Sequence, residues 1–213
     1  MKKIILIGMT LITLSSMLFA KTPQKSKKKS TYVSTTHLHK IFKKLKKTTS
    51  INQEALSEAF FYYEKNRYSK HLSKDYLAIA DYTKIAVKKR LFIIDLHSGK
   101  VRSYLVAHGT NSGAKGGRVW RSSNKRGSYM TPYGFFKIGN KEKISSRKKY
   151  KYLNVEGLEQ KNRNAKQREI LLHTAPYVSK AGRSHGCFAI LPKDRWQIFS
   201  RLKKALFYSY TGR

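Results

Sequence analysis

The sequence has little negative charge and only one cysteine. Asp and Glu number 11 of 213 residues against 46 Lys and Arg, so the formal net charge is +35. A charge of that size attracts polyanions. Because Cys187 has no partner in its own chain, the thiol is either reactive, paired with another molecule or buried. No cluster has zinc or calcium spacing and no glycine loop resembles a phosphate cradle, so we expect neither a metal nor another cofactor.

Residues 1–20 have the layout of a secretory signal peptide. Lys2 and Lys3 precede an apolar run that ends at the small residue Ala20. A membrane anchor is the alternative, but the run is broken by hydroxyl residues and is shorter than the about 20 residues that span a bilayer. We therefore expect export to the periplasm or cell envelope. No nucleic-acid module is recognisable, so the expected polyanions are wall peptides, lipid headgroups and surface polymers.

Residues 21–50 form a basic segment that contains no acidic residue. Runs of like charge usually stay solvated, so a flexible arm is expected that could contact an anionic membrane or envelope polymers. The alternative is a short amphipathic helix over 37–47. Its apolar stripe would touch a membrane surface or the domain, and would consist of Leu38, Ile41, Phe42 and Leu45.

Residues 51–213 are expected to form one mostly β domain with a helix before it and a second helix near the C-terminus. Ser50 followed by Gln53 fits a capping box that opens the first helix over 51–66. Proline at the first turn opens the second helix, over 192–206. Strands are expected where β-branched and aromatic residues gather, at 75–82, 88–97, 100–109, 131–139, 151–158, 169–173, 187–191 and 207–210. A long loop covers 108–128, and loops of that length are usually functional or mobile.

The chemistry is concentrated in HTAPYVSKAGRSHGC, from His173 to Cys187. A cysteine attacks as the thiolate, so it needs a nearby base or a field of backbone N–H groups. A strand that ends at His173 and a loop after it can bring Cys187 back beside the imidazole. Gly186 has no Cβ, so an acyl oxygen can approach the amides of Gly186 and Cys187 as an oxyanion hole. Arg183 and Arg168 could hold a substrate carboxylate.

At these residues the chain resembles the YkuD-type L,D-transpeptidases of bacterial cell walls. The family has a histidine on one strand and S-x-G-C at the start of the next, which stand here as His173 and Ser184-His185-Gly186-Cys187. HTAPY and TPYGFF look like family segments as well. The similarity to the murein L,D-transpeptidase catalytic domain branch runs from about Ile51 to Tyr210. It is carried by ALSEAFFYYEK, DYLAIADYT, RLFIIDLHSGKV, LVAHGTNSG, GLEQKNRNAKQREILLH and GRSHGC.

The resemblance implies a β-rich, sandwich-like catalytic domain that acts on peptidoglycan. Cys187 would attack the peptide bond after the third stem residue, usually meso-diaminopimelate, forming a thioester and releasing D-alanine. His173 would be the base, oriented by the backbone carbonyl of Thr174, and Ser184 would belong to the catalytic motif. An amine of a second stem would then give a cross-link by L,D-transpeptidation. Water in its place would give L,D-carboxypeptidase trimming.

Three further residues are expected at the substrate: Arg183, His108 and His185. Arg183 either binds substrate or forms a surface ion pair, and His108 either lines the groove or ends a hairpin. For His185 the pattern favours a backbone role over imidazole chemistry. The chain departs from the family at Ala189, where many members have arginine, and at Phe188, where the closer branch often has proline. These departures leave open a non-catalytic, basic wall-binding protein on the same fold.

Overall fold

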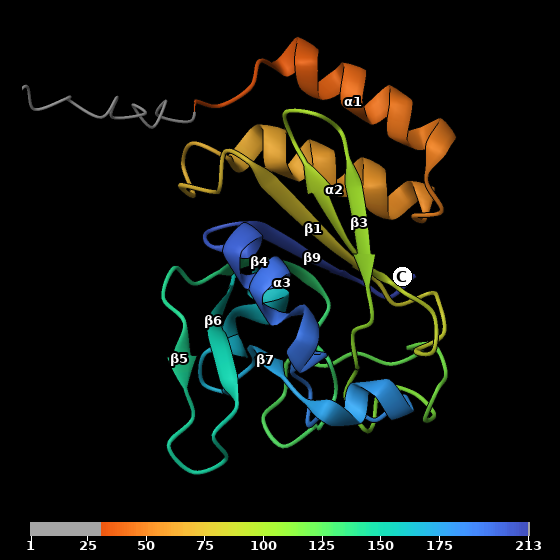
Figure 1. Cartoon of the computed structure of the whole chain (residues 1–213), viewed down its shortest axis with the longest axis vertical. Coiled ribbons are helices and arrows are strands. Elements are labelled where there is room, and N and C mark those ends of the chain that lie inside the picture. Colours follow the sequence, from red (N-terminus) through yellow and green to blue (C-terminus); the bar gives the residue numbers. More distant parts are fainter. Residues whose placement is uncertain (1–30, 213) are drawn as a thin grey trace, which may run out of the picture.

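The computed structural model describes residues 31–212, which form one curved β-sheet with helices on both sides (Figure 1). The expected signal peptide and the first part of the basic segment lie outside the described residues. The helices are α1 (Thr35–Thr48), α2 (Gln53–Asn66) and α3 (Arg195–Leu202), with 3-10 helices η1 (Gln160–Ala165), η2 (Pro176–Lys180) and η3 (Pro192–Asp194). The strands are β1 (Tyr76–Asp81), β2 (Leu91–Asp95), β3 (Val101–Tyr104), β4 (Gly134–Ile138), β5 (Lys143–Ile144), β6 (Lys151–Gly157), β7 (Leu171–Thr174), β8 (Phe188–Ile190) and β9 (Leu206–Tyr210).

The sheet has the strand order β3-β2-β1-β9-β4-β6-β7-β8, with β5 added beside β6. β1 and β9 are parallel, as are β7 and β8, and the other pairs are antiparallel. The chain that follows β3 returns to the opposite end of this order. There the Ala107 amide donates to the Ala189 carbonyl at 2.9 Å, and the Ser184 amide donates to the His108 carbonyl at 2.8 Å. These bonds close the sheet on itself and confirm the mostly β fold.

The two larger apolar cores lie on the two faces of the sheet. Inside the closed sheet, the ring of Phe188 packs between those of Phe136 and Phe207, at 5.4 and 4.6 Å between centroids. The apolar face of α3 joins this inner core. The outer core lies between the sheet and α2, with α1 as the outermost layer (Figure 1). Because β2 and β9 are covered on both faces, their sequences, LFIID and LFYSY, are nearly continuous apolar runs.

α2 begins two residues later than the expected capping box. The cap is Asn52, whose side-chain oxygen accepts from the amides of Glu54 at 2.9 Å and Ala55 at 3.2 Å. The amide of Asn52 is bound in turn by the Asp81 carboxylate at 3.0 Å. The prediction of Ser50 as the cap is therefore wrong. The helix starts where the neighbouring strand supplies an acceptor, which no local pattern reveals.

α1 differs from the flexible arm expected over residues 21–50. Its apolar side chains Leu38, Ile41 and Leu45 are buried against the domain, and the ring of Phe42 lies 5.6 Å from that of Phe60. The lysines project from the opposite side and are exposed, so burial of the stripe proceeds without burying charge. For residues 35–48 the arm prediction is wrong, and the alternative of an amphipathic helix on the domain describes what is found. Among the described residues no helix is long and apolar enough to cross a bilayer.

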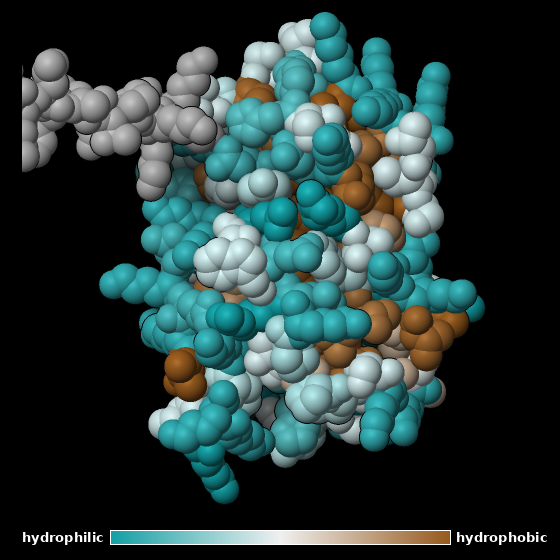
Figure 2. All heavy atoms as spheres, in the orientation of Figure 1, coloured by the Kyte–Doolittle hydropathy of each residue, from teal (hydrophilic) through white to brown (hydrophobic). Residues whose placement is uncertain are grey.

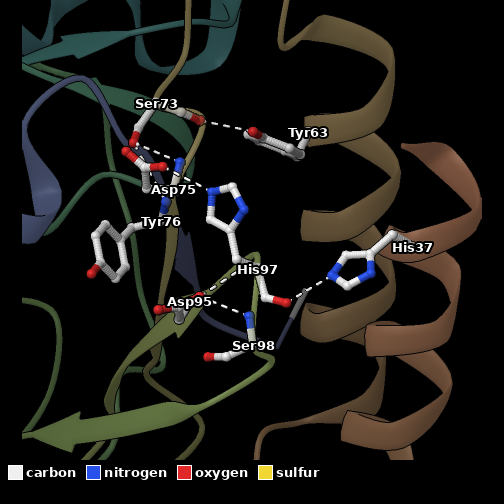
Figure 3. A network of polar contacts seen from close by, with 8 residues as sticks. All are labelled: His37, Tyr63, Ser73, Asp75, Tyr76, Asp95, His97 and Ser98. Atoms are coloured by element: carbon white, nitrogen blue, oxygen red, sulfur yellow. Dashed lines mark hydrogen bonds and ion pairs between the residues drawn. The ribbon is translucent and has the colours of Figure 1, made fainter. Parts of the chain in front are cut away.

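Polar contacts also join α1 to the hairpin between β2 and β3 (Figure 3). The ring of His37 bonds the carbonyl of His97 at 2.8 Å, and the ring of His97 bonds the Asp75 carboxylate at 2.9 Å. In the same turn the Asp95 carboxylate accepts from the amides of His97 and Ser98, each at 2.9 Å. These contacts hold the first turn of α1 in place.

Candidate active site

Cys187 lines a groove of about 1420 Å³. It is partly exposed and immediately precedes β8. The walls come from the loop around β5, from β6, from the segment before β7 and from the loop at 126–129. The molecular face in Figure 2 is mainly hydrophilic, with hydrophobic residues gathered in separate places. The expected nucleophile therefore stands where a peptide could reach it.

The thiol of Cys187 rests in its protonated form. Burial is the main reason why its pKa is raised above the ordinary value, and the nearby carboxylate of Glu169 adds to this. The backbone N–H of Leu171 and the guanidinium of Arg168 act in the opposite direction. The sulfur donates to the backbone carbonyl of Glu169 at 3.4 Å. A base is therefore needed before this thiol can attack.

His173 has the tautomer and the charge of such a base. Its Nδ1 lies 3.1 Å from the Thr174 carbonyl, which can only accept, so Nδ1 carries the hydrogen and Nε2 has the free lone pair. Burial lowers the pKa of His173, with a smaller contribution from the charge of Lys148. The imidazole is thus neutral at neutral pH. The contact with Thr174 is the one that the family resemblance implied.

His173 lies on β7, and Cys187 lies directly before the neighbouring strand β8. His173 pairs with Ala189 across the parallel strands β7 and β8. Phe188 points into the inner core, whereas Ala189 packs on the other side of the sheet. Within the described chain the thiol bonds to Glu169 rather than to the imidazole, so the expected direct hydrogen bond is not formed in this conformation. A rearrangement that brings the sulfur to Nε2 of His173 must therefore precede proton transfer.

The turn before Cys187 is held by Ser184. Its hydroxyl donates to the Cys187 carbonyl at 2.7 Å and accepts from the Gly186 amide at 3.1 Å. Gly186 has φ +119, and a Cβ there would lie 2.7 Å from the Met130 carbonyl. Glycine is thus required by backbone conformation and by close packing. Because the Gly186 amide is already engaged, the Cys187 amide is the remaining candidate of the two expected oxyanion donors.

The two arginines expected to bind a carboxylate have different surroundings. Arg168 lines the groove, but its guanidinium donates to the carbonyls of Ser123 at 2.5 Å and Met130 at 2.6 Å, and so fixes the wall loop. Arg183 is exposed and donates to the Gly113 carbonyl at 3.2 Å. Arg183 is not among the described residues that line the groove. Its first role in this structure is to hold the neighbouring loop.

His108 lies in the interior and does not line the groove, contrary to one of the two interpretations of the sequence. Its Nδ1 accepts from the buried guanidinium of Arg90 at 2.7 Å. Burial, together with the charge of Arg90, lowers the pKa of His108 to about 4. Arg90 also donates to the Val106 carbonyl at 3.0 Å and to the Lys84 carbonyl at 2.9 Å. The histidine therefore completes the acceptor set of a buried cation.

His185 does line the groove, where its exposed ring meets Tyr129 edge-on at 4.9 Å. The ring is therefore available to a ligand, in addition to the backbone role that the sequence pattern favoured. Within the described residues, no group of three or more His, Cys, Asp and Glu side chains could hold a metal ion.

Two residues at the site were missed from the sequence. Tyr150 lines the groove, and its ring lies 4.8 Å from that of His173. The backbone carbonyl of Glu169 accepts a hydrogen bond from the thiol of Cys187. Glu169 also has φ +53, which is uncommon for a residue other than glycine. The signals for them were weak: an aromatic residue in the basic stretch KKYKY, and an acidic residue directly before ILLH.

A family model and several solved structures resemble this chain. The family model described as the L,D-transpeptidase catalytic domain matches residues 47–210. No curated protein matches the chain. Among solved structures, the helical cell shape determining protein Pgp2 from Campylobacter jejuni is similar at 18% identity and TM-score 0.43, over 65% of this chain and 49% of that one. An L,D-transpeptidase from Xylanimonas cellulosilytica is similar at 13% identity and TM-score 0.37, over 64% of this chain and 60% of that one.

The two solved structures are remote in sequence, and this chain spans about half the length of the first. The family model is the stronger finding, since its match at residues 47–210 covers most of the 213-residue chain. It begins within α1 and ends at the last residue of β9, so it includes every strand of the sheet together with Cys187 and His173. The chain belongs to the L,D-transpeptidase catalytic domain family.

Proposed function

We propose that this protein catalyses acyl transfer on the stem peptides of peptidoglycan, with Cys187 as the nucleophile and His173 as the base. Family membership supports the class of reaction. The observation that carries the assignment of residues is the position of Cys187. Its partly exposed thiol lines a groove and directly precedes β8, the strand that pairs with the one carrying the neutral imidazole of His173.

The first half-reaction forms a thioester. Nε2 of His173 takes the thiol proton as sulfur attacks the carbonyl carbon of the third stem residue, and the Cys187 amide faces the developing oxyanion. The C–N bond then breaks, and the proton on the imidazole passes to the departing amine of D-alanine. The thiol gives up its resting bond to Glu169 in this step.

The second half-reaction decides the product. If the amine of a second stem attacks the thioester, the C–S bond breaks and a cross-link forms. If water attacks, the stem is trimmed to a tripeptide, which is the carboxypeptidase alternative. Both routes return the thiol to Cys187 and need no cofactor.

The charge of the groove suits a peptide with free carboxylates. Most of the charged side chains that line it are Lys or Arg, including Arg126, Lys148, Lys166 and Arg168. Stem peptides carry several carboxylates along their length, so the groove and the ligand have opposite charges. This complementarity supports a wall peptide over a neutral or cationic ligand.

The test is incubation with defined tetrapeptide muropeptides. Wild-type protein is expected to release D-alanine and to show a covalent acyl mass on the intact chain. Cys187→Ala, checked for folding by circular dichroism, is expected to do neither. Dimers would indicate cross-linking, and tripeptides alone would indicate trimming. Full turnover by Cys187→Ala would eliminate the mechanism, and no acyl mass on the wild type would favour a non-catalytic wall-binding protein.

We also propose export to the periplasm or cell envelope, on the strength of the signal-like residues 1–20. There the exposed side of α1 would contact anionic polymers or headgroups through Lys40, Lys43, Lys44, Lys46 and Lys47. Binding of the protein to isolated sacculi or to anionic vesicles should then weaken as salt is raised. Recovery of the native protein in the cytoplasmic fraction would contradict the proposal.

A further inference from the structure

The groove has two carboxylates among its described lining residues, Glu156 and Glu169. The side chain of Glu169 is exposed, and among the described residues no ion pair or hydrogen bond engages its carboxylate. An exposed, unpaired carboxylate in a groove whose other charged side chains are mainly Lys and Arg can bind a cationic group of a ligand. The position of Glu169 in the groove therefore suits binding of a cationic ligand group.

Glu169 is also next to the nucleophile. Its backbone carbonyl accepts from the Cys187 sulfur at 3.4 Å. Its negative charge adds to burial in raising the pKa of that thiol, so the carboxylate acts on the reacting atom. Glu156 lies farther along β6 and is absent from the groups that shift this pKa.

The backbone at Glu169 is in a costly conformation. With φ +53 it occupies the left-handed region, which glycine or asparagine would adopt more easily. A residue that remains in an unfavourable conformation beside a reactive group often has a functional reason for its side chain.

We propose that the carboxylate of Glu169 binds the ammonium group of the acceptor stem and positions it at the thioester on Cys187. This inference rests on the proposed acyl-transfer function and concerns only its second half. The groove otherwise repels an ammonium group, since its lining is mainly cationic. A carboxylate at the thiol raises the local concentration of the amine without any effect on water, and so favours cross-linking over trimming.

The chemistry of the step balances. The bound ammonium first loses one proton to solvent, and the resulting amine attacks the thioester carbonyl carbon. As the C–N bond forms and the C–S bond breaks, the second amine proton passes through Nε2 of His173 to the departing sulfur. Glu169 forms no covalent bond and is a positioning residue.

The experiment uses the full chain, a tetrapeptide muropeptide as donor, and a tripeptide muropeptide as acceptor at increasing concentration. Glu169→Gln keeps the shape of the side chain and removes its charge. We expect the KM for the acceptor to rise roughly five- to tenfold and the ratio of dimer to trimmed product to fall in proportion, as for loss of one charge-assisted contact. The donor alone should still yield the acyl mass on Glu169→Gln.

Two further variants separate position from general charge. Glu169→Asp keeps the charge and should restore part of the ratio of dimer to trimmed product that Glu169→Gln loses. Glu156→Gln removes the same charge from farther along the groove and should lower the ratio less than Glu169→Gln does. If Glu169 had only a structural role, its replacement would change donor acylation and the acceptor KM together. Glu169→Asp would then restore neither.

Four results would overturn the inference. An acceptor KM in Glu169→Gln equal to that of the wild type would do so directly. Equal losses in Glu169→Gln and Glu156→Gln would show that only the total charge matters. A wild type that forms the thioester but yields tripeptide at every acceptor concentration would overturn it while the acyl-enzyme function stands. A wild type without any acyl mass would remove both.

Discussion

The ring of Tyr150 lies against the imidazole of His173, with 4.8 Å between the ring centroids and 38° between the ring planes. Tyr150 lines the groove and His173 does not. The tyrosine therefore stands between the open groove and the base. Since burial is the main reason for the low pKa of His173, this contact should affect both the access to the imidazole and its charge.

Replacing Tyr150 with alanine should raise the pKa of His173 towards its ordinary value, because water then reaches the ring. A base must be neutral to accept a proton, so the acid limb of the acylation rate should move to higher pH. NMR titration of the imidazole C–H signals measures the pKa. Tyr150→Phe keeps the ring and should leave the pKa near that of the wild type. An unshifted pKa in Tyr150→Ala would show that other groups bury the imidazole.

The raised pKa of Cys187 should be visible in its alkylation rate. The thiolate is the reactive form, so iodoacetamide should react more slowly at pH 7 than with a free cysteine, and the rate should keep rising above about pH 8.5, the pKa of an ordinary thiol. Glu169→Gln removes a charge that raises this pKa and should move the profile to lower pH. A profile with its midpoint below that of free cysteine would contradict the protonated resting state.

Gly186 should tolerate no side chain. Its φ of +119 is strained for alanine, and the added Cβ would lie 2.7 Å from the Met130 carbonyl. Gly127 is a matched control, since it has φ +72 but nothing within 4 Å of the added Cβ. Gly186→Ala should lower the free energy of unfolding by about 2–4 kcal/mol, and Gly127→Ala by about 1 kcal/mol. Urea denaturation measures both, and equal losses would remove the packing argument.

Much of the sheet could be predicted from the sequence because its strands are rich in β-branched and aromatic residues. LFIID and LFYSY are strands where they were expected, since both faces of the sheet are covered. The basic segment over 35–48 was predicted less well. Its lysines dominate the composition, whereas its structure is decided by three apolar side chains that α2 covers.

The site could be predicted in part. The motif placed His173 on one strand and Cys187 at the start of the next, and in the structure His173 lies on β7 while Cys187 immediately precedes β8. It could not give the contact with Tyr150, which depends on how a loop far along the chain folds back. Nor could it place His108, because the inward or outward direction of that ring depends on the closure of the sheet between 105–110 and β8.

His108 should make the protein less stable in acid. Its folded pKa of about 4 is lower than the usual value near 6.5, so the unfolded chain takes up the proton first. The histidine therefore costs no stability above pH 6.5, and the free energy of unfolding should fall by about 3 kcal/mol as the pH drops from 6.5 to 4. In His108→Asn the amide oxygen can still accept from Arg90. The free energy of unfolding of this variant should lack the decrease that His108 causes between pH 6.5 and pH 4. Urea denaturation midpoints should be measured for the wild type and His108→Asn at pH 7 and pH 4. Equal decreases in both proteins would contradict the prediction.

The docking of α1 gives a test that separates a folded helix from a flexible arm. Leu45 is 1% exposed, so Leu45→Ala should leave a cavity between α1 and α2 and lower the free energy of unfolding by about 2–4 kcal/mol. Lys44 is its exposed neighbour on the same helix, and Lys44→Ala should change stability by no more than about 0.5 kcal/mol. Denaturation in urea should also show one transition in the wild type, since the apolar stripe of α1 shares the outer core with β1 and β9. If residues 35–48 were a solvated arm, Leu45→Ala and Lys44→Ala would have the same small effect, because neither side chain would lose a buried contact.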